Sequence, residues 1–204
     1  MAVSTQAELC SEVLDWYPHA NLTAAKVAEL IVLAEAMINR DSRNIAQETK
    51  VTNVSISAEY VNVPTGFLAV KSFETTTGGK RYALKQLPDE LATDYYPDTG
   101  VPQYYSIVSG QFRFTPVPSA TQTSVLVYYA VLTALGVTAG NTNWLLTNHP
   151  DVYLYCTLGH AAAYLKDPEA AQGYFAVYNG LMESLNRSSN RNRWGGPALV
   201  QRPG

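Results

Sequence analysis

The chain has 204 residues, which is enough for one ordinary domain or for two small subdomains. Hydrophobic residues make up 47% of it and charged residues only 15%, below the roughly 25% of a typical soluble domain. This composition excludes a disordered polymer and a fibrous repeat, and it indicates that part of the surface is not meant for water. No run approaches the roughly 18 to 20 apolar residues of a membrane span, and the N-terminus carries acids where a signal peptide has basic and apolar regions. We therefore expect a chain made and kept in cytosol-like surroundings, with no membrane partner.

Residues 4–38 predict two helices. Thr5 and Glu8 have the spacing of a capping box, and the apolar residues that follow lie on one face until Pro18 ends the run. Further on, apolar side chains recur at i, i+3, i+4, i+7 and i+11, which is typical of a helix with one buried stripe. The residues of that stripe are Val27, Leu30, Ile31, Ala34 and Ile38.

The next part of the chain, from about residue 50, alternates with a period of two and predicts strands. The alternation runs from Asn53 to Tyr60. Gly78-Gly79 and Ser109-Gly110 then supply the turns of two hairpins. The run from Ser124 to Leu132 is apolar on both faces, so we expect it to be a central strand or one covered by the helices.

After Gly136 and Gly140 the period returns to that of a helix. Pro150 begins one predicted helix, and Pro168 begins a second that we expect to end near Asn186. Helices at both ends of a strand block predict an α+β fold, in which a bundle of N- and C-terminal helices contains an inserted antiparallel β domain. The expected boundaries are residues 1–49 and 137–186 for the bundle, 50–136 for the β domain and 187–204 for an extended tail.

The predicted tail differs from the rest of the chain in charge. The net charge of the chain is −3 and the four arginines of residues 187–204 carry +4 without any acid, so the remaining residues carry −7. The tail has little apolar surface to offset an ordering cost of about 1 to 2 kcal/mol per residue. We expect it to be disordered alone and ordered on a partner, and the acidic body favours a protein partner over nucleic acid.

The best candidate for catalysis is Cys156 with His160, which share a helix face at i and i+4. Because Cys is among the most buried residue types and this helix is rich in Ala and Leu, we interpret both as packing residues. Cys10 is the only other cysteine, so neither a disulfide framework nor a thiolate metal site is expected.

Two weaker signals have ordinary structural interpretations. Gly78-Gly79-Lys80 lacks the full phosphate-loop pattern and lies in a predicted hairpin. An acidic group has neither the spacing nor the glycine of a calcium loop, and we interpret it as a solvated turn. Its members are Asp89, Glu90, Asp94 and Asp98. We expect no cofactor and no catalytic metal.

Paired tyrosines are more informative. Neighbouring side chains of a strand point to opposite faces, so each pair should leave at least one phenol off the core. Amphipathic tyrosine is enriched in protein interfaces, although ordinary strand aromatics explain the pattern equally well. The candidate interface residues are Tyr95, Tyr96, Tyr104, Tyr105, Tyr128 and Tyr129.

Four blocks of sequence, in this order, resemble the head-to-tail adaptor (connector) proteins of tailed bacteriophages. The first block is VPQYYSI and the second is GQFRFTPVP; VYY follows, and the last is TNWLL with HPDVYLY. The first three blocks begin at residues 101, 110 and 127, and the two parts of the last begin at residues 142 and 149. The order of helices, β insertion, helices and tail is similar over the whole chain, and the specific residues come mainly from 101–166.

The resemblance implies a structural protein of the virion neck with no enzyme activity. Members of that family usually form a ring of twelve copies beneath the portal protein, carry the tail or nozzle proteins below, and let DNA pass through the channel without specific binding. The resemblance places the C-terminal segment on the portal and the β domain toward tail components. The portal-docking candidates are Arg187, Arg191, Arg193, Trp194, Leu199, Val200 and Arg202.

Two rivals from other classes stay open. A cysteine-dependent hydrolase would use Cys156 and His160 and would show an activity that thiol reagents abolish. A nucleic-acid-binding module would show salt-dependent DNA affinity that comes from the body of the chain and not only from its tail.

For the channel of a phage adaptor, which conducts DNA, we expect a net negative lumen. Four basic residues should then point away from the lumen, namely Lys71, Lys80, Arg81 and Lys85.

Overall fold

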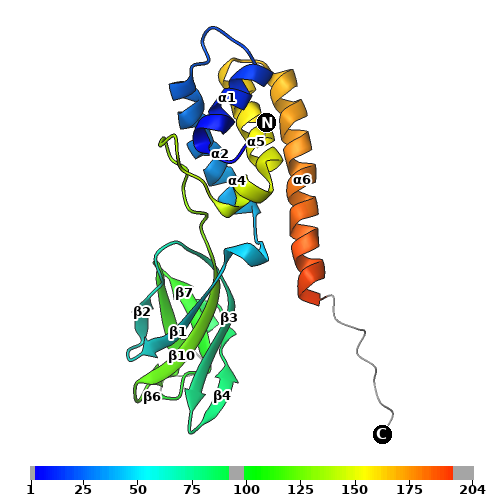
Figure 1. Cartoon of the computed structure of the whole chain (residues 1–204). Helices are drawn as coiled ribbons and strands as arrows, with labels where there is room; N and C mark the ends of the chain where they lie inside the picture. Colours follow the sequence, from blue (N-terminus) through cyan, green and yellow to red (C-terminus); the bar gives the residue numbers. More distant parts are fainter. Residues whose placement is uncertain (1–2, 92–98, 195–204) are drawn as a thin grey trace, which may run out of the picture. The chain divides into compact units, whose positions relative to one another are not determined.

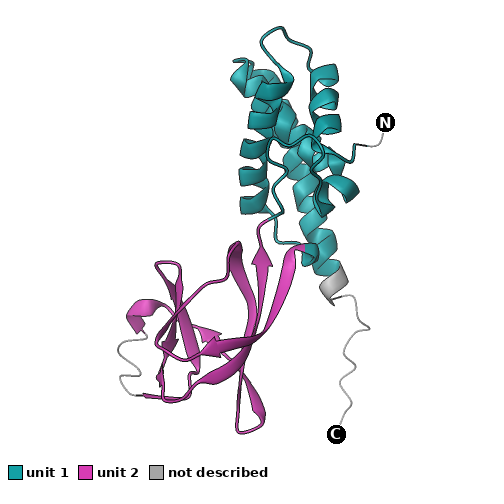
Figure 2. Ribbon diagram, turned by 60° about the vertical axis from the view of Figure 1, so that its left-hand side comes forward, with its two compact units in different colours: residues 1–46, 132–204 teal, residues 47–131 magenta. Residues whose placement is uncertain are grey.

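The computed structural model describes residues 3–91 and 99–194, and these form two compact units. The helical unit contains residues 1–46 and 132–204, and the β unit contains residues 47–131 (Figure 2). N- and C-terminal helices pack together and antiparallel sheets come from the central part of the chain, which confirms the predicted α+β class. Leu132 and Leu135 donate backbone hydrogen bonds to Asn39 and Glu35, so they belong with the helices although the β domain was expected to extend to 136.

The helical unit is built around one buried helix (Figure 1). Its helices are α1 (Gln6–Trp16), α2 (Ala24–Asp41), α4 (Trp144–Asn148), α5 (Pro150–Tyr164) and α6 (Pro168–Trp194). Helix α5 packs against α1, α2, α4 and α6, and nine of its residues are buried. This explains why α5 is apolar all round while α1 and α2 have a single buried stripe.

Local sequence signals set several helix ends. The predicted capping box is present, because the Thr5 side chain accepts from the Glu8 amide and the Glu8 carboxylate accepts from the Thr5 amide at 3.0 Å. Asn143 caps α4 by accepting from the Leu146 amide at 2.9 Å. Pro150 occupies the first turn of α5, but its N-cap residue is His149, which makes no side-chain capping bond.

Helix α6 continues to Trp194, past the end expected near Asn186. The Ile45 amide donates to Ser189 Oγ at 2.9 Å, and Ser189 is buried, so tertiary contact holds this part of the helix. Arg187 also pairs with Glu183 one turn earlier. The prediction of a disordered segment is therefore wrong for residues 187–194, and residues 195–204 lie outside the described part of the chain.

The β unit contains two four-stranded sheets and one two-stranded sheet. Their strand orders are β1-β10-β3-β4, β2-β8-β7-β5 and β6-β9. The strands are β1 (Glu48–Ile56), β2 (Tyr60–Asn62), β3 (Phe67–Thr77), β4 (Lys80–Ala83), β5 (Lys85–Gln86), β6 (Thr99–Gly100), β7 (Tyr104–Val108), β8 (Gln111–Thr115), β9 (Val117–Pro118) and β10 (Gln122–Ala130).

Strand β10 lies between β1 and β3, which confirms the central strand predicted from its two-sided apolar run. Both predicted hairpins are present, with Gly78, Gly79, Ser109 and Gly110 at positive φ in the turns. The alternation expected to reach Tyr60 ends with β1 at Ile56, and Tyr60 begins a separate strand with its ring 43% exposed.

The core of the β unit is aromatic. Phe73 contacts three rings edge-on or tilted, those of Tyr105, Phe112 and Phe114, at centroid distances of 5.3 to 5.6 Å. Such arrangements are each worth about 0.5 to 1.5 kcal/mol beyond the buried area. This core fixes the strands that carry the exposed groups described next.

Candidate interaction surfaces

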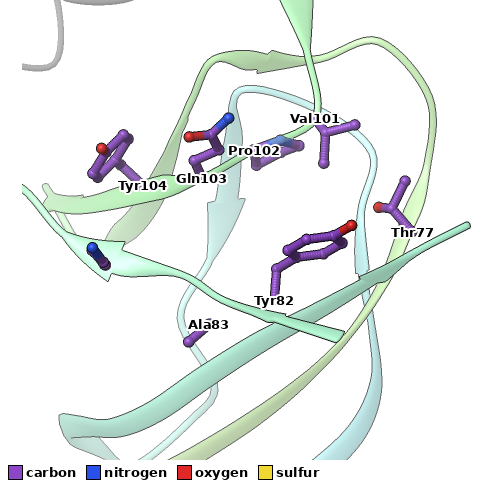
Figure 3. Close-up of a pocket in the computed structure, with 8 residues that line it drawn as sticks. Thr77, Tyr82, Ala83, Val101, Pro102, Gln103 and Tyr104 are labelled. Atoms are coloured by element: carbon purple, nitrogen blue, oxygen red, sulfur yellow. The ribbon is translucent and has the colours of Figure 1, made fainter. Parts of the chain in front are cut away.

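The β unit has an open hollow of about 460 Å³ between the β3–β4 hairpin and the segment that leads into β7 (Figure 3). Tyr82 projects from β4 toward this segment, which contributes Pro102 and Gln103. The hollow contains the exposed ring of Tyr82, and tyrosine is enriched where proteins contact one another. The residues that line it are Thr77, Tyr82, Ala83, Lys85, Val101, Pro102, Gln103 and Tyr104.

Strand β4 lies at the edge of its sheet and all four of its residues are exposed. The turn at Gly78-Gly79 places it there, because both glycines adopt positive φ of 57° and 76°. Lys80 and Arg81 precede Tyr82 on this strand. Charged residues on an exposed edge discourage unwanted strand pairing, and a basic edge also favours an acidic partner.

An ion-pair network covers the side of the β unit that carries β8. Arg113 donates from Nε to Glu59 at 2.8 Å and from Nη1 to Asp89 at 2.9 Å, and Ser106 Oγ donates to Asp89 at 3.0 Å. The Arg113 hydrogen bond is the main influence that lowers the pKa of Asp89. Asp89 therefore has a structural role, and no group of acids, His and Cys among the described residues could hold a metal ion.

Of the other three members of that acidic group, the structure describes only one. Glu90 is exposed in the described part of the chain, while Asp94 and Asp98 lie outside it. The predicted solvated turn is therefore described only up to residue 91.

The structure corrects the interpretation of the tyrosine pairs. Tyr128 and Tyr129 are both buried, because β10 is a central strand whose two faces are both covered here, so the expected exposed phenol is absent. Tyr105 is buried in the aromatic core, and burial raises its pKa. Only Tyr104, half-buried at the hollow, keeps the accessibility that a contact requires. Tyr95 and Tyr96 lie outside the described residues.

Tyr82, 49% exposed, is the interface candidate that sequence reasoning missed. It stands alone between charged and small residues, so no pairing of aromatics pointed to it. The signal that could have found it is the Gly78-Gly79 turn, because a hairpin that ends a sheet exposes its last strand.

Arg187 and Arg191 lie exposed on the last turns of α6. Cationic side chains are favoured there because the helix dipole places partial negative charge at this end. The side chains of Arg193 and Trp194 lie outside the described part, as do Leu199, Val200 and Arg202. Of the predicted portal-docking residues, the structure therefore brings two together on one helix.

Cys156 and His160 are arranged as packing residues. The Cys156 thiol is fully buried and lies 3.9 Å from the Ala34 carbonyl oxygen, and burial raises its pKa to about 12. His160 packs edge-on against Phe175 at 5.2 Å, and burial lowers its pKa. At neutral pH these residues are a neutral thiol and a neutral imidazole, which is the opposite of an activated nucleophile and base.

No helix among the described residues has the length and apolarity needed to cross a bilayer. The described residues form a helical unit from both ends of the chain and an inserted β unit with an aromatic core. Comparison with models of protein families identifies the family of the chain. The family model described as SU10 adaptor protein matches residues 4–201, and the chain belongs to this family of phage head-tail adaptors. A search of curated proteins gives no match.

Proposed function

We propose that this chain forms a ring, with twelve copies, beneath the portal protein of a tailed phage and joins the portal to the tail or nozzle. The observation that carries this proposal is the family match over nearly the whole chain. The family is one of adaptors, so its role is structural rather than catalytic. The neutral, buried thiol of Cys156 also disfavours the hydrolase reading.

In this proposal the C-terminal end of the chain docks on the portal. Arg187 and Arg191 present planar, permanently charged groups on α6, which suit carboxylates on a partner. The four following candidates, Arg193, Trp194, Leu199 and Val200, add one more charge and three apolar anchors, and Arg202 completes the set. The protein would be assembled in the host cytoplasm and would reside in the virion neck.

The β unit carries the contact to tail components in this proposal. The hollow beside Tyr82 and the exposed edge of β4 are the features that support it. An extended segment of a tail or nozzle protein could add to this edge, because a free edge supplies a row of unpaired backbone groups. Tyr82 and Tyr104 would then contact its side chains.

The channel is proposed to conduct DNA without binding it. Each neutralised phosphate releases counterions and adds affinity, so a conduit should present few clustered cations. Lys71 is paired with Glu48 and Arg81 lies 4.0 Å from Glu74, while Lys80 and Lys85 are exposed on or beside β4. The proposal therefore requires the β4 edge to point away from the DNA.

Removal of residues 195–204 tests the docking role. This truncation retains all of α6, including the Ser189 contact with Ile45, so the helical unit should stay folded by circular dichroism. We expect the truncated chain to lose co-sedimentation with the portal, and Trp194→Ala to weaken it. A truncated chain that binds the portal as tightly as the full chain would show that residues 195–204 do not dock on it, and tight binding by Trp194→Ala as well would count against the docking role of this end of the chain.

A further inference from the structure

Strand β4 turns part of its backbone toward a free edge. The Leu84 amide, directly after β4, donates to the Phe73 carbonyl of β3 at 2.8 Å. In an antiparallel pair, alternate residues turn their N–H and C=O groups toward the partner strand. Counting back from Leu84 in the β3–β4 register, Tyr82 turns these groups toward β3, while Arg81 and Ala83 turn them away from it. Within the described residues β4 pairs with β3 alone, so the outward groups of Arg81 and Ala83 are available to an added strand.

The hollow of about 460 Å³ lies beside this edge. Side chains alternate along a strand, so Lys80 and Tyr82 lie on the same face of the sheet as the buried Leu84. Tyr82 projects on this face toward the segment that leads into β7 (Figure 3). One end of the hollow is closed by a backbone hydrogen bond, from the Lys85 amide to the Gln103 carbonyl at 3.1 Å. A strand added to β4 would place every second side chain on the face that carries Tyr82.

The charges along this edge are positive. Lys80 and Lys85 are exposed, and neither forms an ion pair with any residue that the structure describes. Arg81 Nη1 lies 4.0 Å from Glu74 Oε2 and its side chain is 73% exposed, so this contact neutralises its charge only weakly. Positive charge on the edge attracts an acidic segment. It also opposes pairing with the β4 edge of a second copy, because Lys80 and Arg81 would then meet identical cations.

We propose that an acidic, extended segment of a tail or nozzle protein adds to β4 and exchanges backbone hydrogen bonds with Arg81 and Ala83. This inference rests on the proposed function and names the chemistry of the partner that the β unit binds. Acidic side chains of the segment pair with Lys80 and Lys85, and an apolar side chain between them contacts the Tyr82 ring. The free edge favours a polypeptide over a nucleic acid, because only a polypeptide continues the ladder of N–H and C=O groups.

A proline on the edge tests the added strand. Ala83→Pro removes an outward N–H and leaves the hydrogen bonds to β3 in place, and proline is tolerated on an edge strand at such a position. We expect about tenfold weaker binding of the tail or nozzle protein to the full chain on its portal, measured by co-sedimentation. Ala83→Thr keeps the amide, so this matched control should bind normally.

Charge reversal tests the chemistry of the partner. Lys80→Glu combined with Lys85→Glu should weaken the same binding by about tenfold at low salt. Lys50→Glu is the matched control, because Lys50 is exposed on β1 at the opposite edge of the same sheet. A blocked peptide of about six residues that alternates Glu and Val should compete with the tail or nozzle protein, and its Lys and Val counterpart should not.

The outcomes separate this inference from the proposed function. If the tail or nozzle protein binds the unmodified chain, the proline variant and the charge variant equally well, the proposed function stands and the assignment of the β4 edge is wrong. Weak binding by the charge variant alone would show that the cations act without strand addition, and it would also overturn the inference. The same holds if a double-stranded DNA oligonucleotide binds the unmodified chain and loses its affinity in the charge variant, because the edge would then bind nucleic acid. An unmodified chain that binds no tail or nozzle protein, even on its portal, would instead overturn the proposed function.

Discussion

Gly159 is the position where the packing of α5 against α6 can be tested most directly. It is buried on α5, and a Cβ placed there would lie 2.6, 2.8 and 2.9 Å from three ring atoms of Phe175. Ordinary carbon contacts lie at about 3.5 to 4.0 Å, so the ring of Phe175 would have to shift by roughly 1 Å. His160, which packs edge-on against that ring, opposes the shift.

The magnitude follows from two opposing effects. Ala in place of Gly stabilises a helix interior by about 0.5 to 1 kcal/mol, while overpacking a core costs about 1 to 3 kcal/mol. We expect Gly159→Ala to lower the free energy of unfolding of the helical unit by about 1 to 2 kcal/mol. The measurement is urea unfolding followed by circular dichroism at a helical wavelength.

Two further variants make the test specific. Gly180→Ala on α6 meets no atom within 4 Å and should stabilise the free chain by about 0.5 to 1 kcal/mol. In a Phe175→Ala background the added methyl has room, so Gly159→Ala should become neutral or stabilising there. If Gly159→Ala raises stability in the unmodified background, the close approach of the two helices described above is wrong.

Two more outcomes are expected. Cys156→Ala should leave assembly intact and lower the free energy of unfolding by about 1 to 2 kcal/mol. A complete loss of function with normal folding would instead support a catalytic role for Cys156. Burial is the main influence that raises the pKa of Glu35, so the folded chain holds this proton more tightly than the unfolded chain. The stability this gives is present below the ordinary pKa of the carboxyl and is lost as the pH rises through the raised value. Glu35→Gln should remove that part of the pH dependence of thermal unfolding, and an unchanged pH profile would contradict the role of this carboxyl.

Local signals predicted the elements whose determinants are close in sequence. The Thr5–Glu8 capping box and the glycine turns act over a few residues, so the sequence pattern is sufficient to find them. The central position of β10 also followed from its own apolar faces.

Other features depend on contacts between distant residues and could not be predicted in this way. Helix α6 extends past Asn186 because Ser189 meets Ile45, a pairing that no local pattern encodes. Tyr128 and Tyr129 lie on opposite faces of β10, and both are buried. The alternation of a strand predicts the face on which a side chain lies, but it does not predict whether that face is covered. The hollow beside Tyr82 was not predicted for the same reason. It forms between the β3–β4 hairpin and residues 101–104, which are distant in the sequence.

The proposed function requires that copies of the chain form a ring between a portal and a tail. Electron microscopy of negatively stained particles, prepared from the purified full-length chain mixed with the portal of its phage, tests this most directly. We expect a ring of copies of this chain on one end of the portal, with the channel continued through it. A portal that stays bare, or one that carries isolated copies without a closed ring, would contradict the proposed function.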